Sequence, residues 1–271
     1  MIAVADWLSN TDDLPRLERE LLLSDALDLT RAQIITRPER EIPTTTLAEL
    51  DADAHRLRQG EPLAYIIGYR EFWGLAFKVS PAVLIPRPET ELLVELCAKL
   101  APDHGHVLEL GTGSGALAVA IARERPDIKV TATDISQPAL DVAMANAAAH
   151  GVAVEFLHSD WFTACNGLWD VIVTNPPYIA TDDPHLCALQ AEPRAALVSG
   201  NDGLHDLRHI IATAPDFLHV GGHLVLEHGY DQAQRVRALM RRTGYDAVNS
   251  ATDLARIERA TVGCKASSIT G

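Results

Sequence analysis

From His106 onward the chain alternates short apolar runs with amphipathic stretches, and this alternation restricts the possible folds more than any other feature. Buried parallel strands are near-continuous apolar runs, and a helix between two of them returns the chain to the same edge of the sheet. We therefore predict an α/β fold, a parallel sheet with helices on both faces. Its first strands are expected at about 106–110, 128–133, 152–157 and 169–174.

A glycine-rich turn directly follows the first predicted strand. Its residues are Gly111, Thr112, Gly113, Ser114 and Gly115. Glycines let a ligand approach the backbone, and the N-terminus of the following helix presents free N–H groups. The next strand ends at Asp134, 23 residues after Gly111, which is about where an acidic side chain can hold a ribose diol. We expect a nucleoside to bind here.

The turn alone does not identify the nucleoside, because Gly111-x-Gly113-x-x-Ala116 also matches the dinucleotide fingerprint. A nicotinamide enzyme would need hydride-transfer residues as well, and none of the four lysines stands in a Tyr-x-x-x-Lys arrangement. Instead, Asp160 follows the third predicted strand and can accept from an adenine amine, while Trp161 or Phe162 covers the adenine face. These residues favour S-adenosylmethionine.

The fourth predicted strand ends in the motif Asn175, Pro176, Pro177 and Tyr178. Neither proline has an N–H and both have a fixed φ, so the backbone here is stiff. The side-chain oxygen of Asn175 and the carbonyl of Pro176 can converge on one planar NH2 group. Because ligands of open α/β sheets bind at this edge, we predict that a carboxamide or an exocyclic base amine binds to the motif.

The first 70 residues are typical of short helices. Apolar residues recur at helical spacing at Leu14, Leu17, Leu21 and Leu22. A second helix is expected to begin at a capping box of Thr46 and Glu49 and to end before Gly60. The region carries no candidate catalytic residue, and it either docks a partner or extends the packing of the fold.

Apolar residues then alternate around Gly74, which predicts a β-hairpin, and several prolines after it interrupt regular structure. We place the domain boundaries here. The expected layout is a helical docking domain at 1–70, a hairpin linker at 71–86, a catalytic domain at 87–264 and a disordered tail at 265–271.

The charge balance argues against a free nucleic-acid substrate. The chain has 271 residues and a net charge of −14, and it lacks the clusters of Lys and Arg that neutralise phosphates. Its four cysteines show no C-x-x-C spacing, so we expect no metal site. Without a long apolar run or a basic leader, we expect a cytoplasmic monomer that does not contact membranes.

Several segments together resemble the release factor glutamine methyltransferase family, the HemK/PrmC-type enzymes. The resemblance covers nearly the whole chain and rests on residues 68–74, 85–90, 109–115, 159–162, 175–178, 192–197 and 226–229. The Asn-Pro-Pro-Tyr motif is shared with adenine N6 methyltransferases, whereas Pro-Arg-Pro-Glu-Thr and Glu-Pro-Arg are more selective. The closing strand, 256–262, is a looser version of the family's pattern.

The resemblance implies a Rossmann-like, seven-stranded class I methyltransferase domain with a small all-α N-terminal domain. Its expected activity is transfer of a methyl group from S-adenosyl-L-methionine to the glutamine N5 of the Gly-Gly-Gln motif in peptide chain release factors, leaving S-adenosyl-L-homocysteine. With the patterns above, we assign the donor to Glu109, Gly111, Thr112, Gly113, Ser114, Gly115, Asp134, Asp160, Trp161 and Asn175. We assign the glutamine to Asn175, Pro176, Pro177 and Tyr178, with Asn175 and Pro176 catalytic.

An adenine N6 methyltransferase acting on DNA or RNA is the alternative, since it would use the same pocket. Such an enzyme should bring a basic groove or a target-recognition domain, and residues 1–80 are acidic. Four further residues have open roles. Glu109 either reaches the donor's ammonium or is merely solvated, His228 is expected to be structural rather than catalytic, and Glu192 and Arg194 could order the loop after the motif.

Overall fold

The computed structural model describes residues 2–267. The chain divides into two compact units, Met1–Tyr69 and Arg70–Gly271. The segment 71–86, which the sequence placed in a separate linker, therefore lies entirely within the second unit.

The first unit is helical. Its helices are α1 (Val4–Asn10), α2 (Arg16–Leu27), α3 (Arg31–Thr36), α4 (Thr44–Arg58) and α5 (Leu63–Ile67), and the short strands β1 (Ile2–Ala3) and β2 (Glu41–Ile42) pair antiparallel. Two local predictions were wrong. Leu22 is buried as its spacing predicts, but Leu17 is 51% exposed, because α2 turns Leu23 to the core instead. Helix α4 starts directly after Pro43, whose fixed φ suits a helix start, and not at the Thr46 capping box.

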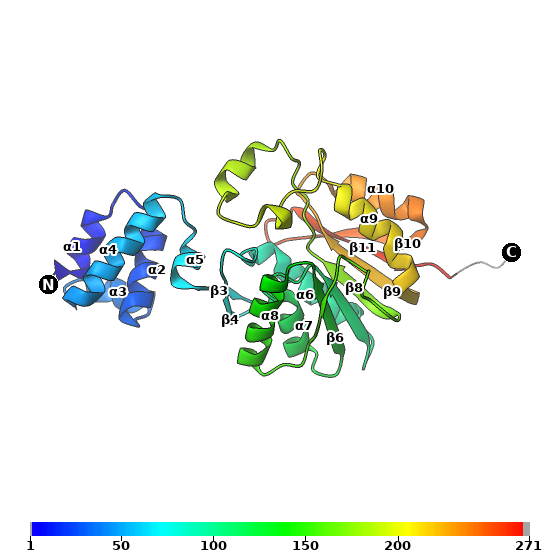
Figure 1. The fold of residues 1–271 in the computed structure, drawn as a ribbon, viewed down its shortest axis with the longest axis horizontal. Helices are drawn as coiled ribbons and strands as arrows, with labels where there is room; N and C mark the ends of the chain where they lie inside the picture. Colours follow the sequence, from blue (N-terminus) through cyan, green and yellow to red (C-terminus); the bar gives the residue numbers. More distant parts are fainter. Residues whose placement is uncertain (1, 268–271) are drawn as a thin grey trace. The chain divides into compact units, whose positions relative to one another are not determined.

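The second unit is built on a seven-stranded sheet of order β10-β11-β9-β8-β5-β6-β7 (Figure 1). Its strands are β5 (His106–Leu110), β6 (Lys129–Asp134), β7 (Glu155–His158), β8 (Trp169–Thr174), β9 (Leu218–Glu227), β10 (Tyr245–Thr252) and β11 (Glu258–Lys265). Strands β5 to β9 are parallel, but β11 runs antiparallel to both β9 and β10. The all-parallel expectation fails there because a short loop without a helix joins β10 to β11.

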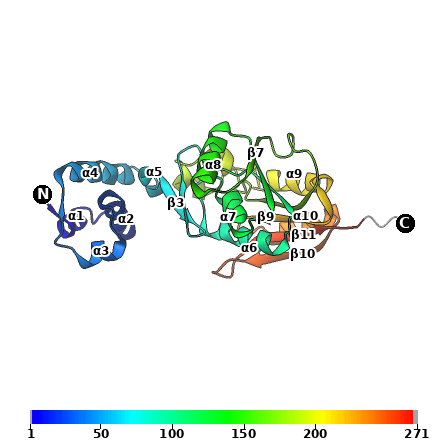
Figure 2. The same ribbon diagram turned by 90° about the horizontal axis from the view of Figure 1, so that it is seen from below.

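Helices cover both faces of this sheet (Figures 1 and 2). Helices α6 (Glu91–Leu100), α7 (Ala116–Glu124) and α8 (Gln137–His150) lie on one face, and α9 (His205–Thr213) and α10 (Ala233–Thr243) lie on the other. Val171 and Val173 of β8 pack into the first layer, whereas Ile172 packs into the second. Both faces of the strand are therefore buried, which explains its continuous apolar sequence.

The hairpin is confirmed as β3 (Tyr69–Phe72) and β4 (Leu75–Lys78). Trp73 and Gly74 have φ values of +54° and +67°, the backbone of a two-residue turn whose twist matches that of the strands. Phe72 and Phe77 are buried and pack edge to face. The described residues also form short 3-10 segments, η1 (Pro88–Thr90), η2 (Pro184–Leu189), η3 (Arg194–Ala196) and η4 (Ala214–Phe217).

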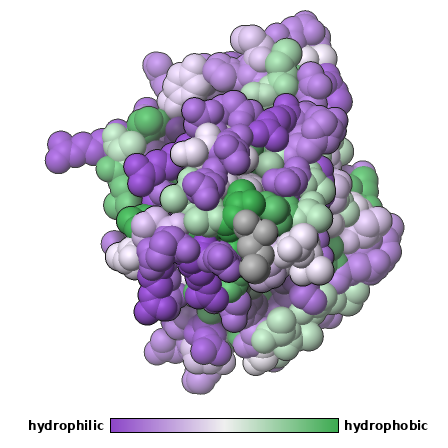
Figure 3. Space-filling model, turned by 90° about the vertical axis from the view of Figure 1, so that its left-hand side faces the viewer, coloured by the Kyte–Doolittle hydropathy of each residue, from purple (hydrophilic) through white to green (hydrophobic). Residues whose placement is uncertain are grey.

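Strand β11 extends to Lys265, so the expected tail starts too early; its last residues, 268–271, lie outside the described part. Among the described residues, no helix combines the length and apolarity that crossing a bilayer requires. The face drawn in Figure 3 is mostly hydrophilic, in keeping with the acidic composition.

Candidate active site

The sheet reverses its direction of growth between β5 and β8. The chain passes from β5 to β6 and β7 on one side, and later adds β8 and β9 on the other. A crevice at the carboxyl ends of the strands forms at such a switch point. The glycine-rich turn follows β5 and Asn175 follows β8, so the topology brings both motifs to this point.

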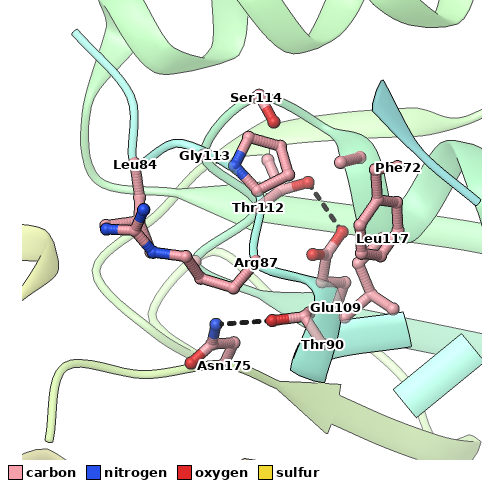
Figure 4. A pocket seen from close by; sticks show the side chains of 13 residues that line it. Phe72, Leu84, Arg87, Thr90, Glu109, Thr112, Gly113, Ser114, Leu117 and Asn175 are labelled. Carbon is pink, nitrogen blue, oxygen red and sulfur yellow. Dashed lines mark hydrogen bonds between the residues drawn. The ribbon is translucent and has the colours of Figure 1, made fainter. Parts of the chain in front are cut away.

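A hollow of about 420 Å³, counting its open mouth, lies there (Figure 4). It is lined by Phe72, Leu84, Pro86, Arg87, Thr90, Glu109, Gly111, Thr112, Gly113, Ser114, Ala116, Leu117 and Asn175. Six residues assigned from the sequence share it, namely Glu109, Gly111, Thr112, Gly113, Ser114 and Asn175. The other assigned residues do not line it. These are Gly115, Asp134, Asp160, Trp161, Pro176, Pro177 and Tyr178.

The turn depends on glycine at two positions for different reasons. Gly113 has φ +55° and faces open space, with no atom within 4 Å of a Cβ built on it. Gly115 has φ +79°, and its Cβ would lie 2.9 Å from that of Ala143 on α8. Gly113 therefore leaves room for a ligand, whereas Gly115 permits close packing of α7 against α8.

Asp134 at the end of β6 holds this turn in place. Its Oδ2 accepts a hydrogen bond from the Gly113 N–H at 2.8 Å, and its Oδ1 accepts one from the Ser136 N–H at 2.8 Å. Each carboxylate oxygen has a second lone-pair site. Asp134 can therefore hold the turn and still accept from a ligand hydroxyl.

Glu109 is 3% exposed, so it is not the solvated carboxylate that its strand-end position allowed. Burial raises its pKa to about 8, against the opposing effect of a hydrogen bond from Thr112. That bond joins Thr112 Oγ1 to Glu109 Oε2 at 2.6 Å (Figure 4). The site therefore holds a carboxyl that favours its neutral form until a cation lies beside it.

The amide of Asn175 has a fixed partner. Its Nδ2 donates to Thr90 Oγ1 at 3.1 Å, and Thr90 Oγ1 donates to Glu227 Oε2 at 2.7 Å. Within residues 2–267 no donor contacts Asn175 Oδ1 or the carbonyl oxygen of Pro176. Neither oxygen therefore has a donor in this part of the chain, and of the two residues Asn175 lines the hollow.

Tyr178 also contacts Glu227. Its hydroxyl donates to Glu227 Oε1 at 3.3 Å, and burial raises the pKa of Tyr178. Trp161 has φ +46°, and its Cζ3 lies 3.6 Å from a Cβ built on Gly111. The indole thus lies beside the turn, whereas Asp160 is exposed.

Residues that the sequence did not assign complete the site. Thr90, Arg87 and Pro86 line the hollow and come from the proline-rich segment after the hairpin. The sequence pointed to Glu227 only through the family resemblance at 226–229. Its position as an acid at the end of a buried strand was the feature that could have marked it as a site residue. Glu192 accepts from the Ile85 N–H at 3.0 Å and pairs with Arg87.

The remaining candidates lie outside the hollow. His228 is buried, its Nδ1 lies 3.0 Å from the Gly229 carbonyl and its Nε2 lies 2.8 Å from Thr261 Oγ1. Burial lowers the pKa of His228. Arg194 is exposed and only reaches the Thr181 carbonyl at 3.5 Å. In the described part of the chain, no three His, Cys, Asp or Glu residues gather as metal ligands would.

Known proteins match both units. The PrmC N-terminal domain model matches residues 5–68, and the Methyltransferase small domain model matches residues 88–200. A T. thermophilus 16S rRNA methyltransferase, solved with AdoMet and guanosine, shares the fold at a TM-score of 0.54 and 21% identity, over 73% of this chain and 49% of that one.

Two relatives are similar over almost their entire length. The release factor glutamine methyltransferase of Neisseria gonorrhoeae is 47% identical over 95% of this chain and 96% of its own. That of Burkholderia pseudomallei is 48% identical over 96% of each. The chain thus belongs to the release factor glutamine methyltransferase family and is a protein-(glutamine-N5) methyltransferase.

Proposed function

We propose that this enzyme methylates N5 of the glutamine in the Gly-Gly-Gln motif of peptide chain release factors, with S-adenosyl-L-methionine as the donor. The observation that carries the proposal is that Asn175 and the glycine-rich turn line one hollow. The relatives' names supply the substrate class. We further propose that the helical domain, 1–70, docks the release factor and that residues 87–264 carry out the transfer.

Residues that line the hollow, together with residues beside the glycine-rich turn, fit the donor chemically. Gly113 leaves open space where a side chain would stand, as a nucleoside next to a helix N-terminus needs. Asp134 would hold the ribose diol, Glu109 would face the ammonium, and Trp161 with Asp160 would bind the adenine. Once bound, S-adenosyl-L-methionine supplies an activated methyl group on a sulfonium whose leaving group is neutral.

The chain's main task is then to position the nucleophile, because an amide nitrogen donates its lone pair into its own carbonyl. Asn175 Oδ1 and the Pro176 carbonyl would accept the two amide hydrogens and aim the nitrogen. Good alignment can supply roughly 7–11 kcal/mol of a barrier, whereas one hydrogen bond contributes a net ~1 kcal/mol. Positioning therefore outweighs removal of a proton by a side chain. Tyr178 shapes the pocket.

The test is to incubate the protein with methyl-labelled S-adenosyl-L-methionine and either a release factor or duplex DNA. We expect label on the release factor, located by peptide mass spectrometry on the glutamine of Gly-Gly-Gln. A release factor whose glutamine is replaced by alanine is the matched control and should stay unlabelled. Label on DNA alone would refute the proposal in favour of an adenine N6 methyltransferase.

A further inference from the structure

Three distant parts of the chain meet behind the Asn175 amide. Thr90 stands 85 residues before Asn175, and Glu227 stands 137 residues after Thr90. Thr90 and Glu227 are both buried. Nothing in the Asn-Pro-Pro-Tyr motif itself requires these two partners, so their arrangement calls for a separate explanation.

The direction of each hydrogen bond follows from proton counting. A threonine hydroxyl has a single proton, and that of Thr90 is donated to Glu227 Oε2 at 2.7 Å. The hydroxyl oxygen can then only accept from Asn175, so the amide must turn its NH2 group toward Thr90, as Figure 4 shows. The side-chain oxygen of Asn175 is left for another ligand.

We propose that Glu227, acting through the Thr90 hydroxyl, fixes the orientation of the Asn175 amide so that an oxygen and not an NH2 group meets the substrate. Thr90 and Glu227 are thus positioning residues. This inference rests on the proposed function, because the orientation matters only if the ligand is itself an NH2 donor. With the amide reversed, two NH2 groups would face each other and the substrate amide would be repelled.

Protonation of Glu227 would reverse the relay. A protonated carboxyl donates to Thr90, whose proton then becomes available to Asn175 Oδ1, and the amide turns over. Burial raises the pKa of Glu227 to about 7, and the neighbouring Glu89 raises it too, while Thr90, Tyr178 and Arg259 oppose the shift. The substrate-binding orientation should therefore become populated as pH rises through about 7.

The main test compares Thr90→Val, which removes the hydroxyl at nearly constant shape, with Thr90→Ser, which restores it. We expect Thr90→Val to lower kcat by roughly 10-fold or more while donor affinity stays within ~2-fold, and Thr90→Ser to recover most of the loss. A peptide carrying Gly-Gly-Glu serves as the second probe. Wild type should prefer Gly-Gly-Gln, and Thr90→Val should lose much of that preference in binding.

Two further measurements separate a relay from a merely structural role. Exchange of the Asn175 side-chain amide protons, followed by NMR, should be slow in wild type and faster in Thr90→Val, irrespective of activity. In Glu227→Gln, the rise of kcat through about pH 7 should vanish.

Thr174→Val is the matched control. It removes a buried 2.7 Å hydrogen bond to the Leu110 carbonyl, so it should lower stability but leave the Gln-over-Glu preference unchanged.

The outcomes distinguish the two proposals. If wild type transfers no methyl group to glutamine, the proposed function fails. If wild type does so, but Thr90→Val matches it in kcat, peptide preference and amide exchange, the relay is refuted and the function stands.

Discussion

Glu192 accepts a hydrogen bond from the backbone N–H of Ile85 at 3.0 Å, across 107 residues of sequence. The same carboxylate pairs with Arg87, which lines the hollow. One buried acid thus joins the loop after the Asn-Pro-Pro-Tyr motif to the proline-rich wall of the pocket. This contact explains physically why both segments take part in one site.

Glu192→Ala should loosen this wall. The change leaves the buried Ile85 N–H and the partly exposed Arg87 guanidinium without their partner, and we expect unfolding free energy to fall by about 1–3 kcal/mol and release-factor KM to rise. Denaturant unfolding and steady-state kinetics measure both effects. Arg194→Ala, at an exposed residue of the same motif, should stay within about 0.5 kcal/mol of wild type. Equal effects of the two substitutions would contradict the assignment.

Asn175→Ala should strongly slow methyl transfer while lowering the affinity for the donor much less. Removal of the acceptor that aims the nucleophile is expected to reduce kcat roughly 10²–10³-fold, as loss of an oriented donor or acceptor does elsewhere. Calorimetry with S-adenosyl-L-methionine should show a much smaller loss of affinity. Asn166→Ala, in an exposed loop where the side chain only reaches the Ala164 carbonyl, is the control and should behave as wild type. Near-normal transfer by Asn175→Ala would disprove the two-acceptor mechanism.

Glu109 makes stability depend on pH. Its pKa in the folded chain is about 8, raised by burial from an ordinary 4.5, so the folded state binds the proton more tightly than the unfolded state. The stabilisation that this tighter proton binding gives the folded state is complete below pH 4.5 and is lost as pH rises through about 8. In Glu109→Gln, the melting temperature relative to wild type should therefore increase between pH 5 and pH 8.5. A difference that stays constant with pH would show that Glu109 is not the titrating group.

Asp134 should not be replaceable by its amide. Two backbone N–H groups, of Gly113 and Ser136, each need one of its oxygens, and asparagine offers only one. Asp134→Asn is expected to cost roughly 1–3 kcal/mol of stability through the unpaired N–H and to weaken donor binding as well. Thermal unfolding of the free protein tests the first effect, and calorimetry tests the second. Wild-type stability in Asp134→Asn would mean that the carboxylate does not hold the turn.

The two glycines should respond differently to alanine. In Gly115→Ala, the new methyl meets Ala143 at 2.9 Å, and we expect loss of about 2–4 kcal/mol from crowding and the left-handed backbone together. In Gly113→Ala, only the backbone cost of about 1–2 kcal/mol remains, but the methyl enters the hollow and donor affinity should fall. Urea melts and donor titrations of both variants check this division. The reverse ranking of stabilities would be inconsistent with the packing described.

Much of the fold followed from local pattern. Strands 106–110 and 169–174 have the bounds expected of them, because a continuous apolar run buried on two faces has few alternatives to a central parallel strand. The hairpin followed from alternation around Gly74. The antiparallel β11 was missed, since hydrophobic periodicity gives a strand's burial but not its direction.

The sequence by itself determined the motifs, the glycine turn and the strands that carry them, because turn chemistry and periodicity act between neighbouring residues. Only the tertiary structure decided that Thr90 and Glu227 stand behind Asn175, that Glu192 secures Ile85, and that Glu109 is buried. Those contacts depend on strand order and register across the sheet. Local sequence does not encode which distant side chains this arrangement brings within hydrogen-bonding distance.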